Sequence, residues 1–319
     1  MTHAPLLLLA AAALLLSAAG CRPAPTGTPP ARRAAFPVFS AENGTNALAR
    51  AAAFLDAAPS RDAGSPGAMA AAGWIAGQLR EMGIRCAIDV FRDAAPGGET
   101  TFRNVVAEIP SPTTNLPPVL LLSHFDTKSG IPGFTGANDG ASSTALLLEI
   151  ASVAAAGGDL GFPLQLAFLD GEECRVEYGP QDGLHGSRRL AALARKSGVD
   201  YRAVVVLDMV GDRDLDAMIP ANGDPGLARL LLAAANECGL GEYVRPGEFA
   251  ILDDHQPFLD AGYPAIDLID FHYGSQPGLN DYWHTDEDTL DKLSATSFEI
   301  VGRVVFAFLR LLGERPGGR

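Results

Sequence analysis

The amino-acid sequence predicts an α/β fold, a three-layer sandwich with a mostly parallel central sheet and helices on both of its faces. Segments with helical spacing alternate along the chain with short apolar runs, as in chains built from βαβ units. The runs at 118–126 and 201–211 are almost continuously apolar, which is typical of interior strands buried on both faces. No long linker interrupts the later sequence of this 319-residue chain, so the bulk of it is expected to form one domain.

Strands and helices are expected in a regular order. A helical pattern at 68–83 stops at Gly83 and is followed by a strand at 86–91. The other helices are predicted at 140–157, 186–198, 225–239 and 294–313. The other strands are predicted at 102–110, 118–126, 163–170, 201–211 and 264–270. In a sheet of this kind ligands bind beyond the carboxyl ends of the strands.

Residues 1–21 are typical of an export signal. Their apolar stretch is too short for an ordinary membrane span and ends in small residues before Cys21. The ending SAAGC resembles a bacterial lipoprotein cleavage box with Cys21 as lipid acceptor, although Ala18 replaces the usual Leu and no Lys or Arg precedes the apolar run. Lipidation is therefore expected, with plain secretion and a retained anchor as alternatives. Residues 22–40 are rich in Pro and Ala and are expected to form an extended tether. Residues 41–315 are expected to form a single domain.

The charge of the chain limits its partners. A formal net charge of −14, from 38 acidic and 24 basic residues, argues against nucleic acid and anionic membrane surfaces as electrostatic partners. Membrane contact is expected through a lipid anchor alone. Beyond the export signal, Cys86, Cys174 and Cys238 are too few to predict a disulfide framework.

Polar residues end three of the predicted buried strands. His124 and Asp126 end the first, Glu172 and Glu173 follow the second, and Asp208 ends the third. Because the strands are expected to be parallel, these residues should lie together at one edge of the sheet. Two adjacent carboxylates near a core need a compensating cation or proton, because they repel each other and lose hydration.

Two further residues join this set: Asp139 lies in a Gly-rich turn before a helix, and His284 lies in a late loop. Taken singly, each candidate has a structural explanation, such as Asp139 capping the following helix. Together they form a ligand set that suits zinc in a catalytic site. The candidate ligands are His124, Asp139, Glu173, Asp208 and His284.

Five segments, HFD, GANDGAS, DGEE, LDMVG and WHTDEDT, resemble in order and spacing the metal-site segments of the M28 zinc peptidases, which include bacterial aminopeptidases and the glutaminyl cyclases. The resemblance covers about residues 58–312 and implies an M28 catalytic domain with a zinc aminopeptidase-like fold. It also implies that Glu173 binds zinc and that Glu172 shuttles protons.

Other segments favour the cyclase branch. The spacer CRVEYGPQD lies between the Glu pair and the Gly-Ser turn, and RDAGSPG, HFDTK and DDHQPF also resemble cyclase segments. Glutaminyl cyclases convert an N-terminal glutamine of a peptide into pyroglutamate and release ammonia. The resemblance implies zinc ligands Asp139, Glu173 and His284, and catalytic roles for Glu172, Asp208 and Asp253.

Alternatives remain open at this point. A two-zinc M28 aminopeptidase would use His124 and Asp208 as additional ligands, so one or two zinc ions are possible. A catalytically inactive peptide-binding lipoprotein is a third interpretation, which the presence of every candidate ligand disfavours. Asp254 is the alternative to Asp253 in the DDH segment.

The substrate pocket is expected to include Tyr178, Trp283 and His255. Animal cyclases carry Trp where this chain has Tyr178, and two cysteines where it has Ser123 and Thr144, so their disulfide cannot form here. Two further polar residues, Lys128 and His185, are expected to be solvated surface groups.

Overall fold

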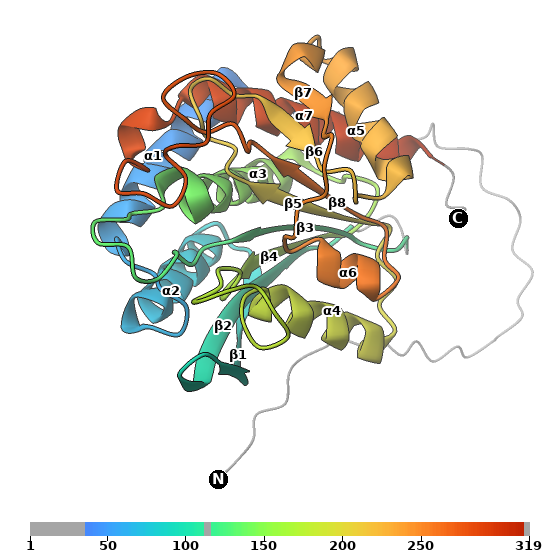
Figure 1. Ribbon diagram of the computed structural model, residues 1–319. Helices are drawn as coiled ribbons and strands as arrows, with labels where there is room; N and C mark the ends of the chain where they lie inside the picture. Colours follow the sequence, from blue (N-terminus) through green and yellow to red (C-terminus); the bar gives the residue numbers. More distant parts are fainter. Residues whose placement is uncertain (1–35, 112–115, 316–319) are drawn as a thin grey trace, which may run out of the picture. The chain divides into compact units, whose positions relative to one another are not determined.

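The computed structural model describes residues 36–111 and 116–315, and the expected export signal and most of the tether lie outside these ranges. The described chain forms an eight-stranded sheet with helices on both faces (Figure 1). The strand order is β1-β2-β4-β3-β5-β8-β6-β7. This confirms the predicted α/β sandwich.

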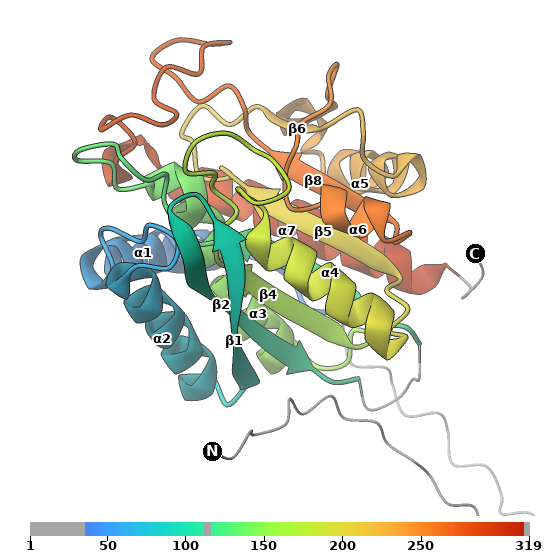
Figure 2. The ribbon, with the colours of Figure 1, turned by 60° about the horizontal axis from the view of Figure 1, so that its bottom comes forward.

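The middle of the sheet is parallel, antiparallel pairs lie on both sides of it, and the edge strand β7 pairs in parallel with β6. Strands β4, β3, β5 and β8 pair in parallel, whereas β1 with β2, β2 with β4, and β6 with β8 pair antiparallel. The two long strands β1 and β2 form a hairpin at one edge (Figure 2). The strands are β1 Arg85–Ala95, β2 Gly98–Ile109, β3 Val119–His124, β4 Leu164–Leu169, β5 Ala203–Asp208, β6 Ala217–Ile219, β7 Val244–Pro246 and β8 Ala265–Ile269.

The helices form the two outer layers. One hydrophobic cluster joins α1, α2, α3, α5 and α7 to one face of the sheet, and a smaller cluster joins α4 and α6 to the other. The helices are α1 Ala41–Ala57, α2 Pro66–Glu81, α3 Ser143–Gly157, α4 His185–Ser197, α5 Pro225–Glu237, α6 Gln256–Asp260 and α7 Ala295–Glu314. Shorter turns are η1 Ala137–Ser142, η2 Gly241–Tyr243 and η3 Leu290–Lys292.

Local sequence explains where several helices begin. The Ser40 hydroxyl accepts the backbone N–H of Asn43, and the Asn43 side chain accepts the backbone N–H of Ser40, forming a capping box before α1. Ser65 caps α2 and Asp224 caps α5, and in both helices a proline at the first position fixes a helical φ. These signals position the helices that cover the larger hydrophobic cluster.

The segment 137–157, which contains η1 and α3, is long and apolar enough to cross a membrane by composition. Of its most apolar window, 72% is buried inside the domain. Most of the buried residues of α3 are alanine, leucine or isoleucine. This segment is therefore the central core helix of the sandwich.

The parallel register aligns the strand ends that carry polar residues. His124 pairs in register with Leu169, so the end of β3 lies beside the end of β4 and the Glu pair that follows it. Asp208 pairs with Ile269, at the end of β8. The polar residues of three strands therefore share one edge of the sheet, as expected.

Candidate metal centre and active site

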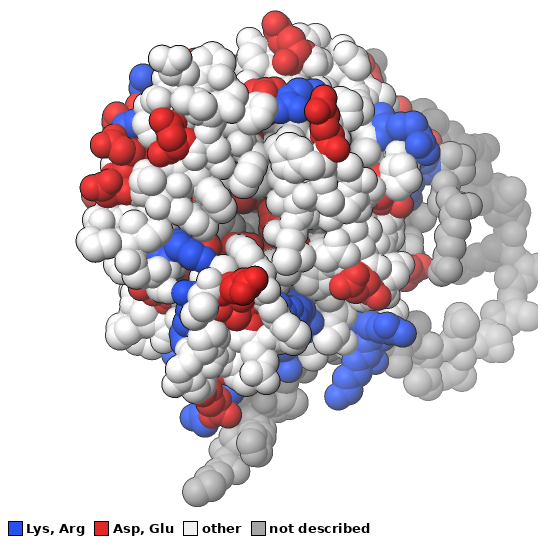
Figure 3. All heavy atoms as spheres, viewed as in Figure 1, with Lys and Arg blue, Asp and Glu red and all other residues white. Residues whose placement is uncertain are grey.

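Five elements bring the candidate ligands together above this edge. His124 ends β3 and Asp208 ends β5, whereas Glu173 follows β4 by a few residues. Asp139 lies in η1, and His284 lies in the loop between β8 and η3. On the same face, Figure 3 shows a hollow near the centre with acidic atoms inside it. The sheet edge thus gathers residues that are far apart in sequence.

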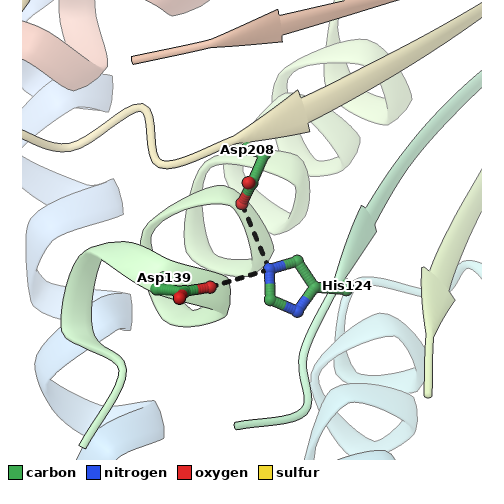
Figure 4. A group of neighbouring side chains, drawn as sticks. All are labelled: His124, Asp139 and Asp208. Atoms are coloured by element: carbon green, nitrogen blue, oxygen red, sulfur yellow. Dashed lines mark hydrogen bonds and ion pairs between the residues drawn. The ribbon is translucent and has the colours of Figure 1, made fainter. Parts of the chain in front are cut away.

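A first group consists of His124, Asp139 and Asp208 (Figure 4). The Nε2 atom of His124 lies 3.2 Å from Oδ1 of Asp139 and 3.1 Å from Oδ1 of Asp208. All three side chains are buried. One imidazole nitrogen therefore faces two carboxylates.

A second group consists of Asp139, Glu173 and His284. The Nε2 atom of His284 lies 3.2 Å from Oδ2 of Asp139 and 2.9 Å from Oε1 of Glu173. Asp139 belongs to both groups, with one oxygen directed toward each histidine. The structure therefore brings together all five ligands predicted from the sequence, as two trios that share Asp139.

The donor atoms of these trios fit a divalent cation. Within each trio the candidate ligand atoms all lie within 4.8 Å of one another. Among the described residues, Asp139 Oδ2 and Glu173 Oε2 accept no hydrogen bond and have only ion-pair contacts, at 3.2 Å from His284 Nε2 and 3.7 Å from Lys128 Nζ. Buried carboxylates without hydrogen-bond partners need a compensating charge. Imidazole and carboxylate donors without a thiolate match the ligand chemistry of catalytic zinc.

The pKa values of three acidic residues at the centre are raised, because the carboxylates are buried and close together. Burial, followed by the charge of Asp139, raises the pKa of Glu173 to about 7. Burial, followed by the charge of Glu173, raises the pKa of Glu172 well above its ordinary value. Burial also raises the pKa of Asp208 to about 6, although His124 opposes this. A bound cation at Glu173 would favour the ionised carboxylate.

The η1 turn gives Asp139 its orientation. Gly140 has a φ of 93°, and a Cβ atom there would lie 3.1 Å from Cε1 of His124, so glycine permits this close approach. The carboxylate of Asp288 accepts the backbone N–H groups of Asn138 and Asp139. Asp139 does not cap α3, which has no side-chain cap. The structural explanation for Asp139 as a helix cap is therefore wrong.

Arg61 supports the same turn through hydrogen bonds to backbone carbonyls. It is fully buried, its Nε donates to the carbonyl of Phe125 and its Nη2 donates to the carbonyl of Gly136. Burial lowers the pKa of its guanidinium to about 10, against the opposing charges of Asp288 and Asp126. Arg61 thereby joins the end of β3 to the turn that holds Asp139.

Asp126 orients the Glu pair. Its Oδ1 and Oδ2 atoms accept the backbone N–H groups of Glu172 and Glu173, each at 3.1 Å. The sequence places Asp126 at a strand end but predicts no role for it. Together, Asp126, Asp288 and Arg61 position the candidate ligands, and their presence in the HFD, WHTDEDT and RDAGSPG segments was the available signal.

Glu172 has surroundings different from those of Glu173. The Tyr178 hydroxyl donates to Oε1 of Glu172 at 2.9 Å. Burial, followed by the charge of Glu172, raises the pKa of Tyr178, so its phenol remains a donor. The negative charge of Asp253 further raises the pKa values of both Glu172 and Asp208. Asp253 thus lies near both Glu172 and Asp208.

The other residues predicted to line the substrate pocket are Trp283 and His255, and they contact different neighbours. Trp283 stacks on the imidazole of His284, with centroids 3.9 Å apart and planes inclined by 22°. His284 itself has a φ of 56°, an uncommon conformation for a residue other than glycine. His255 is fully buried beside Asn222, and burial lowers its pKa. Asp254 is fully buried next to Asp253.

Two expectations are wrong. Lys128 is not a solvated surface group, because its Nζ lies 2.8 Å from Sγ of Cys174 and 3.7 Å from Oε2 of Glu173. His185 is 2% exposed, stacks on Phe102 and lies 2.9 Å from Asp93 through Nδ1. Both side chains find partners that are distant in sequence, and these partners make their burial favourable.

Comparisons with known proteins find relatives of this chain in sequence and in structure. Residues 104–309 match peptidase family M28. A glutaminyl-peptide cyclotransferase-like protein of Bos taurus is 31% identical over 78% of this chain and 71% of its own length. The glutaminyl-peptide cyclotransferase of Bos taurus is 30% identical over 77% of this chain and 76% of its own length.

A solved structure of similar sequence is the glutaminyl cyclase of an Acidobacteriales bacterium. It is 34% identical, with a TM-score of 0.80, over 92% of this chain and 100% of that protein. These similarities confirm the resemblance to the M28 family and to its glutaminyl cyclase branch. The chain belongs to peptidase family M28.

Proposed function

We propose that this protein is a zinc-dependent glutaminyl cyclase, which converts the N-terminal glutamine of peptides into pyroglutamate and releases ammonia. The observation that carries the proposal is the division of the Glu pair. Glu172 accepts a hydrogen bond from the Tyr178 hydroxyl. Glu173 instead lies beside His284 and Asp139, and these three residues could share one metal ion. This division supports one proton-carrying acid and one metal-binding acid, and the cyclotransferase relatives support the reaction.

Zinc is proposed at Asp139, Glu173 and His284. When bound there, zinc would polarise the side-chain amide carbonyl of the substrate glutamine. Asp126 and Asp288 keep the two carboxylates in place through backbone N–H groups, and the Trp283 ring keeps the imidazole of His284 in place. These supporting contacts are of the kind that orient metal ligands.

The chain's own groups would move the protons. The α-amine of the substrate attacks the Cδ atom of its own glutamine side chain, so that a new C–N bond closes the ring. Glu172 accepts the proton that the amine loses and returns it to the departing amide nitrogen, which leaves as ammonia. Asp253, which acts on both Glu172 and Asp208, and Asp208 itself are proposed to hold the substrate and its intermediate by hydrogen bonds. No water nucleophile is required.

An M28 aminopeptidase is the second candidate, and the His124, Asp139 and Asp208 trio specifically favours it. That trio offers a second cation position, and two metals sharing a carboxylate would activate water for hydrolysis. In the cyclase proposal, by contrast, His124 pairs with its carboxylates. Burial lowers the pKa of His124, but Asp208, Asp126 and Asp139 outweigh this and raise it, which supports an imidazolium there.

The deciding experiment uses paired peptides that begin with Gln or Leu and are otherwise identical. A cyclase releases ammonia from the Gln peptide without shortening it, whereas an aminopeptidase frees leucine from the Leu peptide. Neither product, with peptide still bound, would instead favour the inactive peptide-binding interpretation.

Export and lipid anchoring at Cys21 are proposed from residues 1–21, which lie outside the described residues. The catalytic domain would then be tethered at the outer face of a membrane, toward the periplasm or cell exterior, by the Pro-rich segment. Cys21→Ser should release the protein from washed membranes of its host. Wild-type protein found wholly in the soluble fraction would leave secretion without an anchor.

A further inference from the structure

A groove lies between α4 and α6, on the opposite face of the sheet from α1, α3 and α7. Figures 1 and 2 both place α4 and α6 side by side. The groove has a volume of about 490 Å³. Much of its lining is apolar, formed by residues that include Leu184, Ala191, Ala192, Leu252, Pro257 and Ala261. Its size is within the range of ligand pockets.

The groove adjoins the candidate active site through two of its lining residues. Tyr178 lines the groove, and its hydroxyl donates to Glu172. Leu252 also lines the groove and directly precedes Asp253, the acid near Glu172. A molecule whose reacting end lies at Glu172 would therefore meet the groove on the far side of the Tyr178 ring.

Hydrogen bonds hold both walls in place. Arg188 on α4 donates from Nη1 to the carbonyl of Pro180 and from Nη2 to the carbonyl of Gly179, which fixes the spacer that carries Tyr178. On the other wall, Gln256 accepts from Asn222 and donates to Asp260. A groove with fixed walls loses little conformational entropy when it is filled.

We propose that this groove binds the part of a peptide substrate that follows its N-terminal residue, and that it prefers apolar side chains there. The inference rests on the proposed function, because a peptide that reacts at its N-terminus must place its remaining residues outside the reacting site. Leu184, Ala191, Ala192 and Ala261 offer an apolar surface for those side chains. The groove would make the protein selective for peptides over free glutamine derivatives.

The test fills the groove at Ala192, whose side chain is exposed on α4. Ala192→Trp is compared with Ala70→Trp, which adds the same side chain to an exposed position of α2 on the other face of the sheet. The substrates are a Gln-Gly dipeptide amide and pentapeptides that continue from Gln-Gly with three leucines or three aspartates. KM and kcat are measured for each through ammonia release.

Wild type and Ala70→Trp should show a KM about tenfold lower for the leucine pentapeptide than for the dipeptide amide, in line with burial of one or two apolar side chains. Ala192→Trp should lose this advantage and keep the KM and kcat of the dipeptide amide. Equal KM values for all three substrates in wild type would overturn the inference. A KM increase in Ala192→Trp that is the same for dipeptide and pentapeptide would also overturn it.

A binding measurement separates this inference from the proposed reaction. The leucine pentapeptide carries a fluorophore at its C-terminus, and fluorescence anisotropy gives its Kd for each variant. Absence of ammonia release from every Gln peptide would reject the cyclase proposal alone, if the labelled peptide still binds wild type about tenfold more tightly than Ala192→Trp. Equal binding by wild type and Ala192→Trp would reject the groove, whatever the activity.

Discussion

The Tyr178 hydroxyl donates a 2.9 Å hydrogen bond to Glu172, while the adjacent Glu173 lies 2.9 Å from the imidazole of His284. Two neighbouring carboxylates are thus directed at partners with different chemistry. The phenol stabilises negative charge on Glu172 without neutralising it, so this acid can still take up a proton. Burial and the charge of Glu173 raise the pKa of Glu172, which prepares it for that exchange.

Tyr178→Phe tests this relationship by removing the donor and keeping the ring. We expect kcat to fall by about tenfold, because a hydrogen bond to a charged group is worth about 1.5–3 kcal/mol and solvent replaces part of it. The pKa of Glu172 should rise further, so the acidic limb of the pH–rate profile should move to higher pH. Tyr243→Phe, in the short turn before β7, is the matched control and should behave as wild type. An unchanged profile in Tyr178→Phe would mean that the phenol has no influence on the reacting acid.

Metal removal tests the two trios separately. A strong chelator should abolish activity and added zinc should restore it, because the proposed centre has carboxylate and imidazole ligands. His284→Ala should lower the zinc content measured by elemental analysis. His124→Ala should keep one zinc per chain, because in the cyclase proposal His124 pairs with Asp139 and Asp208 and binds no metal. Two zinc ions in wild type, with one lost from His124→Ala, would instead favour the aminopeptidase arrangement.

The stability of the protein should depend on pH through Asp212, which follows β5. Burial, followed by the charge of Asp270, raises the pKa of Asp212 from 3.8 to about 7. Between these values the folded chain holds a proton that the unfolded chain has lost, so this group makes the free energy of unfolding fall as pH rises. Asp212→Asn should remove this fall in the free energy of unfolding, because the Asn side chain does not titrate.

Urea unfolding of wild type and Asp212→Asn at several pH values measures the effect. The variant should be more stable than wild type at about pH 8, where Asp212 is ionised in both states, and the difference should shrink toward about pH 4. The Asn side chain can still accept the backbone N–H of Asp214, so the local turn is preserved. A stability difference that does not change with pH would contradict this explanation.

The sequence predicted secondary structure best where a single signal, such as a continuous apolar run, was strong. Every residue of β3 and β5 is buried, and their continuous apolar runs predicted this. The helix α1 was missed because alanine and glycine form most of its buried face, including Gly44, Ala47 and Ala51. Strands β6 and β7 have three residues each, too few to display a period.

The site was predictable to a similar extent. Parallel strands align their carboxyl ends, so strand-end acids and histidines could be grouped from the sequence alone. Lys128 and His185 could not be placed, because the burial of a polar side chain depends on partners that folding brings near. Cys174 lies 46 positions after Lys128, and Asp93 lies 92 positions before His185. The groove between α4 and α6 likewise depends on how helices distant in sequence pack.

The Glu pair provides the most direct test of the mechanism. Glu172→Gln keeps nearly the same shape but cannot accept and return a proton, so turnover should fall by about 10²-fold or more while zinc stays bound. Glu173→Gln should weaken zinc binding, because an amide oxygen is a poorer ligand than a carboxylate.

Activity and zinc content are measured side by side on both variants, with Glu177→Gln in the exposed spacer as the control. That control carries the same chemical change outside the ligand trios and should keep both properties of wild type. Zinc lost from the Glu172 variant and retained by the Glu173 variant would mean that the roles of the pair are reversed. Near-normal turnover in both would exclude the end of β4 from the active site. The contrast is informative because Asp126 holds the two backbone N–H groups alike, so differences between the variants arise from their side chains.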